Sequence, residues 1–411
     1  MSANRIQTPP LPVLKLLALA TAAFLTLLTE IMPAGLLSSI ATGLDVSESL
    51  AGQFITAFAL GALLSAIPAT ALTRGMRRKP LLLIAISGFA VVNAVTAFSD
   101  SYVLSLVARF VAGLFGGVVW SMLAGYASRM VPRWLLGRAI AIVGAGSTAA
   151  LVLGVPIGGL LGSVIGWQGA FGLVSAIAVL LVVWIVLFAP DFPGESADKR
   201  LSLPQVAAKR GVGATLALIL TYIVTHNILY IYIEPFLVAS AMGDWLNGVL
   251  FIFGAGAVFG LVLSGIIVDG NLKRLGPAEV FLFAAATLLL GLWSDVQVIL
   301  ILAVFMWGIS FGGFSVVTQT AMTHLSSDAV DVAQSMSTTS WNTAVASGGV
   351  IGGLLLSSAG PGAFPWVMIG LLTLSFLVVL LGVNRALAAA KPAQSVSVRS
   401  DSLMQSSNQH L

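Results

Sequence analysis

Three ionisable side chains, Glu30, Arg109 and Glu234, lie inside long apolar segments of this 411-residue chain. Glu30 belongs to the stretch TLLTEIMPAGLL, and no other charge occurs between Lys15 and Asp45, a span long enough to cross a bilayer. A charge inserted in such a helix costs roughly 2.5–3.5 kcal/mol, so these residues usually face a bundle interior or a water-filled cavity. We therefore expect the three residues to couple the movement of protons or of a substrate.

The chemistry open to them is proton exchange or ligand binding. A carboxyl group in a partly dry cavity can take up and release a proton near neutral pH, or it can bind a substrate directly. Arg109 is the one Lys or Arg that we expect deep inside a helix, where it would contact an anion or influence a neighbouring carboxylate. The alternatives are structural: a paired carboxylate at Glu30, a carboxylate near the outer interface at Glu234, and a structural pin at Arg109.

Polar and aromatic side chains accompany the two carboxylates on the same helix faces. A proline follows each carboxylate closely, at Pro33 and Pro235, and this pattern favours Glu234 as the counterpart of Glu30. Membrane-embedded polar groups face the bundle interior, so one polar cavity is expected between the helices. The residues that we expect to line it are Thr26, His226, Asn227, Tyr230, Trp341 and Asn342.

The composition is that of a membrane protein. The chain is 58% hydrophobic and 8% charged, whereas a soluble domain carries about 25% charged residues. The basic residues are distributed over short connections instead of one patch, which argues against a nucleic-acid partner. The chain has no cysteine, so disulfides and cysteine metal sites are excluded.

Twelve apolar runs, separated by short polar breaks, predict twelve transmembrane helices. Arg and Lys occupy the even-numbered connections except the tenth, which has neither, and they are missing from the odd-numbered ones. The positive-inside rule therefore predicts that both termini lie in the cytoplasm of a cell-membrane protein. The expected spans are 15–39, 49–72, 80–99, 101–128, 138–162, 167–189, 213–239, 246–268, 277–294, 297–323, 335–358 and 363–386.

The chain divides into two similar halves. The stretches PIGGLLG (156–162) and VIGGLLL (350–356) correspond, as do LFGGVV (114–119) and SFGGFS (310–315), at an offset of roughly 195 residues. Such repeats are typical of transporters with two related bundles. We expect a six-helix bundle over 1–190, a cytoplasmic linker over 191–212, a second six-helix bundle over 213–388 and a cytoplasmic tail over 389–411.

The connection between the second and third spans, ATALTRGMRRK (69–79), resembles a loop motif of the major facilitator superfamily, within its drug:proton antiporter group. Thr73 stands where that motif usually has Asp, and the second copy keeps Asp269. The resemblance implies the two-bundle fold of that family and a cytoplasmic gate. The gate residues would be Arg74, Arg77, Arg78, Asp269 and Arg274.

Two further stretches carry the same resemblance. Arg109, followed by glycines in YVLSLVARFVAGLFGG (102–117), is similar to the family's helix-four motif. The stretch that holds Gly154, Pro156, Gly158 and Gly159 is similar to the family's antiporter motif, and TEIMPAGLL to the helix-one signature of its sugar and nucleoside efflux branch. Glycines four residues apart also allow close helix packing. The packed helix faces would either stay fixed or slide past each other during alternating access.

No phosphate-binding loop, metal-ligand cluster or catalytic triad occurs in the sequence, so we expect no cofactor, no metal and no enzyme activity. The prediction is a monomeric, proton-coupled exporter of a drug, sugar or purine nucleoside that works by alternating access in the bilayer. An importer or facilitator of the same fold stays open, and a membrane-bound enzyme or sensor is the alternative from another class.

Overall fold

The computed structural model describes residues 11–195 and 201–389, apart from the side chains of Glu48, Ser49, Val155, Pro156 and Asn247. The described part contains helices and no strand. All of the predicted tail except Ala389 lies outside the described residues, so nothing follows here about that segment.

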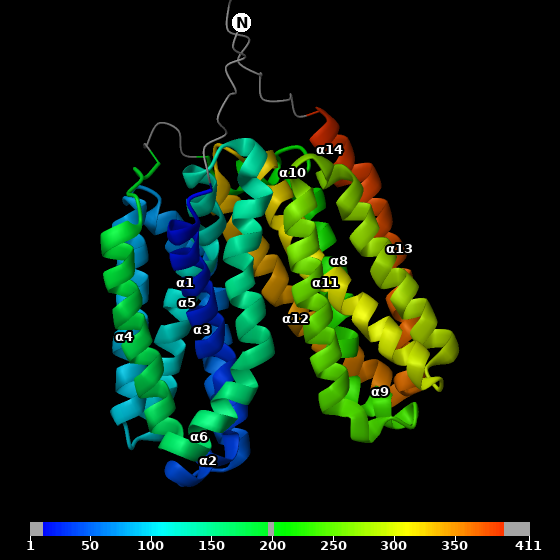
Figure 1. The fold of residues 1–411 in the computed structure, drawn as a ribbon, viewed down its shortest axis with the longest axis horizontal. Helices are drawn as coiled ribbons and strands as arrows, with labels where there is room; N and C mark the ends of the chain where they lie inside the picture. Colours follow the sequence, from blue (N-terminus) through cyan, green and yellow to red (C-terminus); the bar gives the residue numbers. More distant parts are fainter. Residues whose placement is uncertain (1–10, 196–200, 390–411) are drawn as a thin grey trace, which may run out of the picture.

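The first half of the chain folds into one bundle and the second half into another (Figure 1). The first contains α1 (Val13–Ile31), α2 (Leu37–Gly43), α3 (Glu48–Thr73), α4 (Arg78–Phe98), α5 (Tyr102–Met130) and α6 (Leu136–Phe188). The short α7 (Leu203–Ala207) belongs to the linker. The second bundle contains α8 (Val212–Ile231), α9 (Ile233–Ala239), α10 (Leu246–Trp293), α11 (Gln297–Leu325), α12 (Val330–Ala359), α13 (Phe364–Val378) and α14 (Asn384–Ala389).

Two of these helices are pairs joined at a sharp break. Gly166, with φ of 73°, divides α6, and Gly270, with φ of 152°, divides α10. Only glycine adopts such backbone angles without strain, so each break lies at a glycine. Ten segments of the described chain are long and apolar enough to span a membrane, one of which, Gly248–Trp293, holds both parts of α10. With α12, which is long but more polar, they account for the twelve predicted helices.

Proline ends the first helix of each bundle at a similar place. Proline removes a backbone donor and clashes with the carbonyl four residues earlier, so a helix rarely runs through it. The helix α1 therefore stops at Ile31, and a 3₁₀ turn over Met32–Leu36 that contains Pro33 leads into α2. Likewise α8 stops at Ile231, and Pro235 lies in the first turn of α9.

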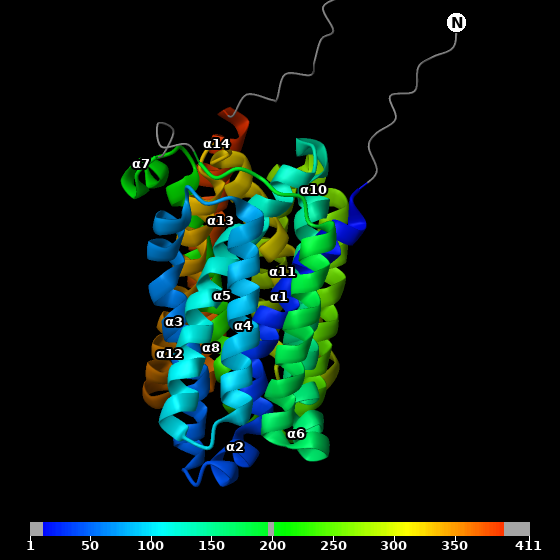
Figure 2. The ribbon, with the colours of Figure 1, turned by 90° about the vertical axis from the view of Figure 1, so that its left-hand side faces the viewer.

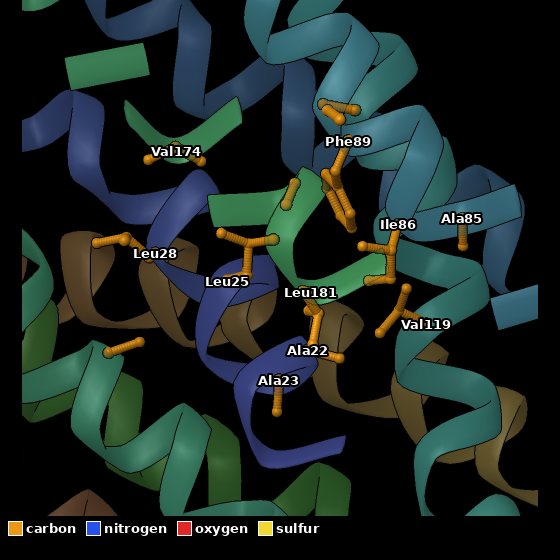
Figure 3. Packing of buried hydrophobic residues seen from close by; sticks show 14 of the residues in the cluster. Ala22, Ala23, Leu25, Leu28, Ala85, Ile86, Phe89, Val119, Val174 and Leu181 are labelled. Carbon is orange, nitrogen blue, oxygen red and sulfur yellow. The ribbon is translucent and has the colours of Figure 1, made fainter. Parts of the chain in front are cut away.

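Each bundle has its own hydrophobic core. In the first bundle, Leu25, Phe89 and Leu181 come from α1, α4 and α6 and pack together (Figure 3). The second core is built from α8 to α13 around side chains such as Trp307 and Phe283. Large apolar side chains such as Leu72 and Phe98 are 85% and 87% exposed on the outside, as expected for surfaces that face lipid.

Small residues let the fifth and eleventh spans pack closely on the first and seventh. A side chain at Gly154 would meet Ile31, and one at Gly158 would meet the carbonyl of Met32. In the second bundle, a side chain at Gly348 would meet Val224 and Asn227 of α8. The same helix pair is thus in close contact in both halves, which is the packing that small residues at this spacing permit.

Candidate functional site

A cavity of about 320 Å³ lies between the two bundles. Four helices of the first bundle (α1, α3, α5 and α6) and three of the second (α8, α11 and α12) contribute to its wall. Its size is within the range of small-molecule sites. The residues that line it are Leu27, Glu30, Ala62, Trp120, Ser147, Thr148, Leu151, Ile219, His226, Asn227, Tyr230, Phe311, Gly312, Ser315, Thr318, Gln319, Gln334, Ser337, Thr338, Trp341, Asn342 and Val345.

The wall combines apolar surface with many uncharged polar side chains. Among the described residues that line it, Glu30 is the only carboxylate, and none is Lys or Arg. In Asn227 and Asn342 the side-chain NH₂ donates to the carbonyl four residues earlier, Ile223 and Thr338 respectively. Their side-chain carbonyls are thereby left to accept hydrogen bonds from a ligand.

Arg109 lies behind Glu30 in the first bundle and is completely buried. Its Nη2 donates to the carbonyl oxygen of Thr29, and its guanidinium lies 5.1 Å from the ring centre of Phe58 and 5.4 Å from that of Phe171. Its Nε and Nη1 have no hydrogen-bond partner among the described residues. Buried donors are rarely left unpaired. Arg109 does not line the cavity, so these two donors lie within the first bundle, behind the cavity wall.

Glu30 and Arg109 interact electrostatically but are not hydrogen-bonded to each other. No N···O distance between their side chains falls within 4.0 Å, so they do not form a direct ion pair in this state. Two opposed influences act on the carboxyl group, since low polarity disfavours its charged form and Arg109 favours it. The carboxylate is therefore placed in the cavity with a cation close behind it.

His226 is held in one orientation by an aromatic cluster in the second bundle. The indole Nε1–H of Trp307 donates to Nδ1 of His226 at 3.2 Å, and the ring of Phe311 stacks on the imidazole with centroids 4.2 Å apart. Indole can only donate, so Nδ1 is the acceptor and the imidazole proton is on Nε2. His226 therefore has an N–H group left to donate to a ligand.

Glu234 does not share this cavity. Its side chain is exposed in the first turn of α9, beyond the break that separates this helix from α8. At the offset of 196 that separates LFGGVV from SFGGFS, Glu30 instead corresponds to His226, and LTE (28–30) matches VTH (224–226). The proline that follows both Glu30 and Glu234 thus led to the wrong match. The residue that corresponds to Glu30 in the second half is His226.

The other predicted cavity residues divide into two groups. His226, Asn227, Tyr230, Trp341 and Asn342 line the cavity. Thr26 does not, because its side chain is buried and its hydroxyl donates to the carbonyl of Ala22 within α1.

The two bundles are joined by ion pairs at the end that carries the basic loops. Arg78 of α4 lies 2.7 Å from Asp331 of α12, and each side chain is 2% exposed. Arg129 approaches the same carboxylate at 3.1 Å. Asp269 accepts the backbone N–H groups of Gly137 at 2.5 Å and of Arg138 at 3.1 Å. Every ion pair between described residues of the two bundles lies at this end.

The remaining predicted gate residues do not bridge the bundles. Arg74 and Arg77 bind carboxylates of the linker, Glu195 and Asp191. Arg274 is exposed and forms no ion pair with a described residue. Pro156 lies in α6, and its side chain is outside the described residues.

Two acids escaped the sequence analysis. Asp331, in the first turn of α12, falls in a stretch that the sequence predicts as a connection, and nothing in that stretch indicates its partner. Glu279 lies in the second part of α10, near the start of an expected span, where a charge is unremarkable in sequence, yet it is 5% exposed in the structure. Its Oε1 accepts the hydroxyl of Ser264 at 2.6 Å, and its backbone carbonyl accepts the hydroxyl of Ser310 at 2.6 Å.

Comparisons with known proteins agree on one family. A family model described as "Major Facilitator Superfamily" matches residues 19–278. The chain is 30% identical to a "Probable sugar efflux transporter" of Mannheimia succiniciproducens, over 84% of this chain and 88% of that protein. It is 27% identical to a "Probable sugar efflux transporter" of Helicobacter pylori, over 89% and 94%. It is also 27% identical to the "Purine ribonucleoside efflux pump NepI" of Escherichia coli O127:H6, over 81% and 85%.

Solved structures show the same fold. The human organic anion transporter MFSD10 matches with a TM-score of 0.71 at 19% identity, over 91% of this chain and 100% of that chain. The proton:xylose symporter XylE matches with a TM-score of 0.72 at 14% identity, over 92% and 98%. The predicted all-helical fold with two six-helix bundles is thereby confirmed.

Proposed function

We propose that this chain, which belongs to the major facilitator superfamily, is a proton-coupled exporter of a small uncharged compound, either a sugar or a purine nucleoside. The family consists of multi-pass membrane transporters, so the chain is a transporter and not an enzyme. What we propose is the direction of transport, its coupling to protons and the class of the substrate.

The observation that carries proton coupling is the position of Glu30. It is the only carboxylate among the described cavity residues, and buried Arg109 lies behind it with two unused donors. When a proton leaves Glu30, its negative charge can be stabilised by this guanidinium, and when a proton binds, the cavity becomes neutral and can release or accept a ligand. A single site that both a proton and a substrate can reach is sufficient for exchange.

The arrangement of the ion pairs supports alternating access. The basic loops mark the cytoplasmic side, as the positive-inside rule predicts, and with that orientation both termini lie in the cytoplasm. Figure 1 shows the described start of α1 and the last helix, α14, at the same end of the molecule. Ion pairs close the bundles against each other at that end, so we assign the structure to an outward-facing state. Rocking of the bundles would break these pairs and expose the cavity to the cytoplasm.

The cavity wall supports an uncharged, hydroxyl-rich substrate. Amide carbonyls of Asn227 and Asn342 can accept hydroxyl protons, the Nε2–H of His226 can donate, and Phe311 and Trp341 offer faces for a ring. The names of the relatives, sugar efflux transporter and purine ribonucleoside efflux pump, are in keeping with this chemistry.

The test uses purified protein in liposomes with a trapped pH-sensitive dye. A radiolabelled pentose, a hexose and inosine are offered in turn under an imposed pH gradient. We expect at least one of them to move against its own gradient, with protons moving in the opposite direction. Substrate movement that dissipates its gradient and carries no protons would indicate a facilitator, and movement in the same direction as protons would indicate an importer.

A further inference from the structure

The basic loop at the cytoplasmic end concentrates positive charge. Four basic residues, Arg74, Arg77, Arg78 and Lys79, fall within six positions, and no acid lies among them. Like charges this close repel one another, and the repulsion is strongest where side chains are buried. Arg78 is the residue that reaches across to Asp331, so its position depends on how the other charges are neutralised.

The start of the linker supplies the missing carboxylates. Glu195 binds Nε of Arg74 at 2.8 Å, with both side chains largely buried, at 10% exposure for Arg74 and 13% for Glu195. Asp191 binds Nε of Arg77 at 2.5 Å and also accepts the backbone N–H of Lys79 at 3.2 Å. Figure 2 shows the described start of the linker at the top of the molecule, at the end where α7 also lies.

Backbone hydrogen bonds show that this segment is docked and not merely nearby. The N–H of Arg78 donates to the carbonyl of Phe192 at 2.9 Å, and the N–H of Glu195 donates to the carbonyl of Arg74 at 2.8 Å. The hydroxyl of Tyr126 donates to the carbonyl of Pro190 at 2.6 Å. The linker thus binds the basic loop on both sides of Arg78 and orders its backbone.

With the linker docked, Arg78 forms its ion pair with an acid of the other bundle. Its Nη2 lies 2.7 Å from Asp331, while its loop neighbours are already paired with linker carboxylates. We propose that Asp191 and Glu195 are positioning residues of the cytoplasmic closure, which hold the basic loop so that Arg78 can bind Asp331. This inference rests on the proposed alternating access, because it assigns the linker a role in the balance between the two states.

Asp191 carries a permanent negative charge. Although partial desolvation acts to raise it, hydrogen bonds from Arg77 and from the Lys79 backbone lower the pKa of Asp191 below its usual range. Asp191 therefore stays ionised down to acid pH, and the stability that its pairing contributes is lost only as the pH falls through that lowered pKa. The pair of Asp191 with Arg77 is accordingly present in the closed state throughout the physiological pH range.

The other end of the linker provides a matched control. Lys209 forms an ion pair with Asp328, whose side chain is 61% exposed, and Val206 of α7 is buried against the second bundle. This pair belongs to the same linker but does not touch the basic loop. Its loss should leave the closure unchanged if the effect of Asp191 and Glu195 is specific.

The experiment exploits the absence of cysteine from the chain. Trp134→Cys and Lys273→Cys introduce two exposed sites at the cytoplasmic ends of the two bundles for spin labels. The distance between the labels is measured on the full chain in liposomes, without substrate. In this background, D191N/E195Q should raise the ratio of open to closed molecules about three- to tenfold, as loss of two partly exposed pairs would allow. D328N should leave the ratio unchanged.

Two further variants separate positioning from simple destabilisation. The exchange Arg74→Glu with Glu195→Arg should restore the closed distance that E195Q alone loses, since the pair is re-formed with reversed charges. If the D191N/E195Q protein does not fold, E195Q is measured in its place. An unchanged distance distribution in folded E195Q, or a lowered melting temperature without any change of distance, would overturn the inference. Because no transport is measured, a shift in distance supports the positioning role even if the proton coupling of the chain is disproved.

Discussion

The substitution Asp331→Asn tests the closure that joins the two bundles. Asp331 is paired with Arg78 at 2.7 Å, and both side chains are 2% exposed. At an effective dielectric constant of 20, two charges at this distance attract each other by about 6 kcal/mol before desolvation is counted. Removal of one partner of a buried pair typically costs roughly 3–5 kcal/mol, because the other charge is left buried.

That cost falls on the closed state alone. In an inward-facing state Arg78 can be hydrated, so the amide substitution costs little there. A differential cost of about 3–5 kcal/mol would shift the ratio of the two states by a factor of roughly 150 to 5,000. The partly exposed Arg129 can retain water, so we take the lower end as the expected value.

The assay is the distance between spin labels at Trp134→Cys and Lys273→Cys, in the full chain with and without Asp331→Asn. We expect the short distance to disappear from most molecules and transport to slow, because the outward-facing state is depleted. Asp328→Asn is the matched control, since among the described residues the ion-pair partner of that acid is Lys209, at the surface. A closed distance that survives Asp331→Asn in a folded protein would refute the reasoning.

Three other predictions concern the cavity and the bundle interiors. Arg109→Ala should abolish transport while the protein still inserts and folds, as checked by export assays beside size-exclusion profiles; normal transport would exclude a coupling role. Trp307→Phe removes the N–H that orients His226 and should weaken substrate binding about five- to tenfold, the effect of one hydrogen bond, in a binding titration. Glu279→Gln should leave folding and transport largely intact because Gln can still accept from Ser264, whereas Glu279→Lys should lower the melting temperature markedly.

The helices and their order could be predicted from the sequence because lipid permits few solutions. A backbone that crosses the bilayer must satisfy its own hydrogen bonds, so hydropathy and Lys and Arg counts are nearly sufficient to locate the spans. The breaks next to Pro33 and Pro235 follow from local sequence in the same way. Glu30 was identifiable because a lone carboxylate in an apolar run has few reasons to be there.

The interactions that close the molecule could not be predicted because they join distant segments. Asp331 lies in a stretch that the sequence predicts as a connection, where a charge is ordinary, and its partner Arg78 is more than 250 residues away. The docking of Asp191 and Glu195 on the basic loop is likewise invisible in the linker's composition. The match of Glu30 with Glu234 was wrong because it depended on a local feature, the nearby proline. Which side chains line the cavity depends instead on the register of whole helices.

Glu30→Gln in liposomes tests the central claim most directly. The variant and the unaltered protein are compared in two assays: exchange of labelled substrate at equal pH, and substrate accumulation driven by a pH gradient. If Glu30 carries the proton, the variant keeps substrate exchange but loses accumulation and its dependence on pH. Accumulation that remains pH-driven in Glu30→Gln would contradict the account.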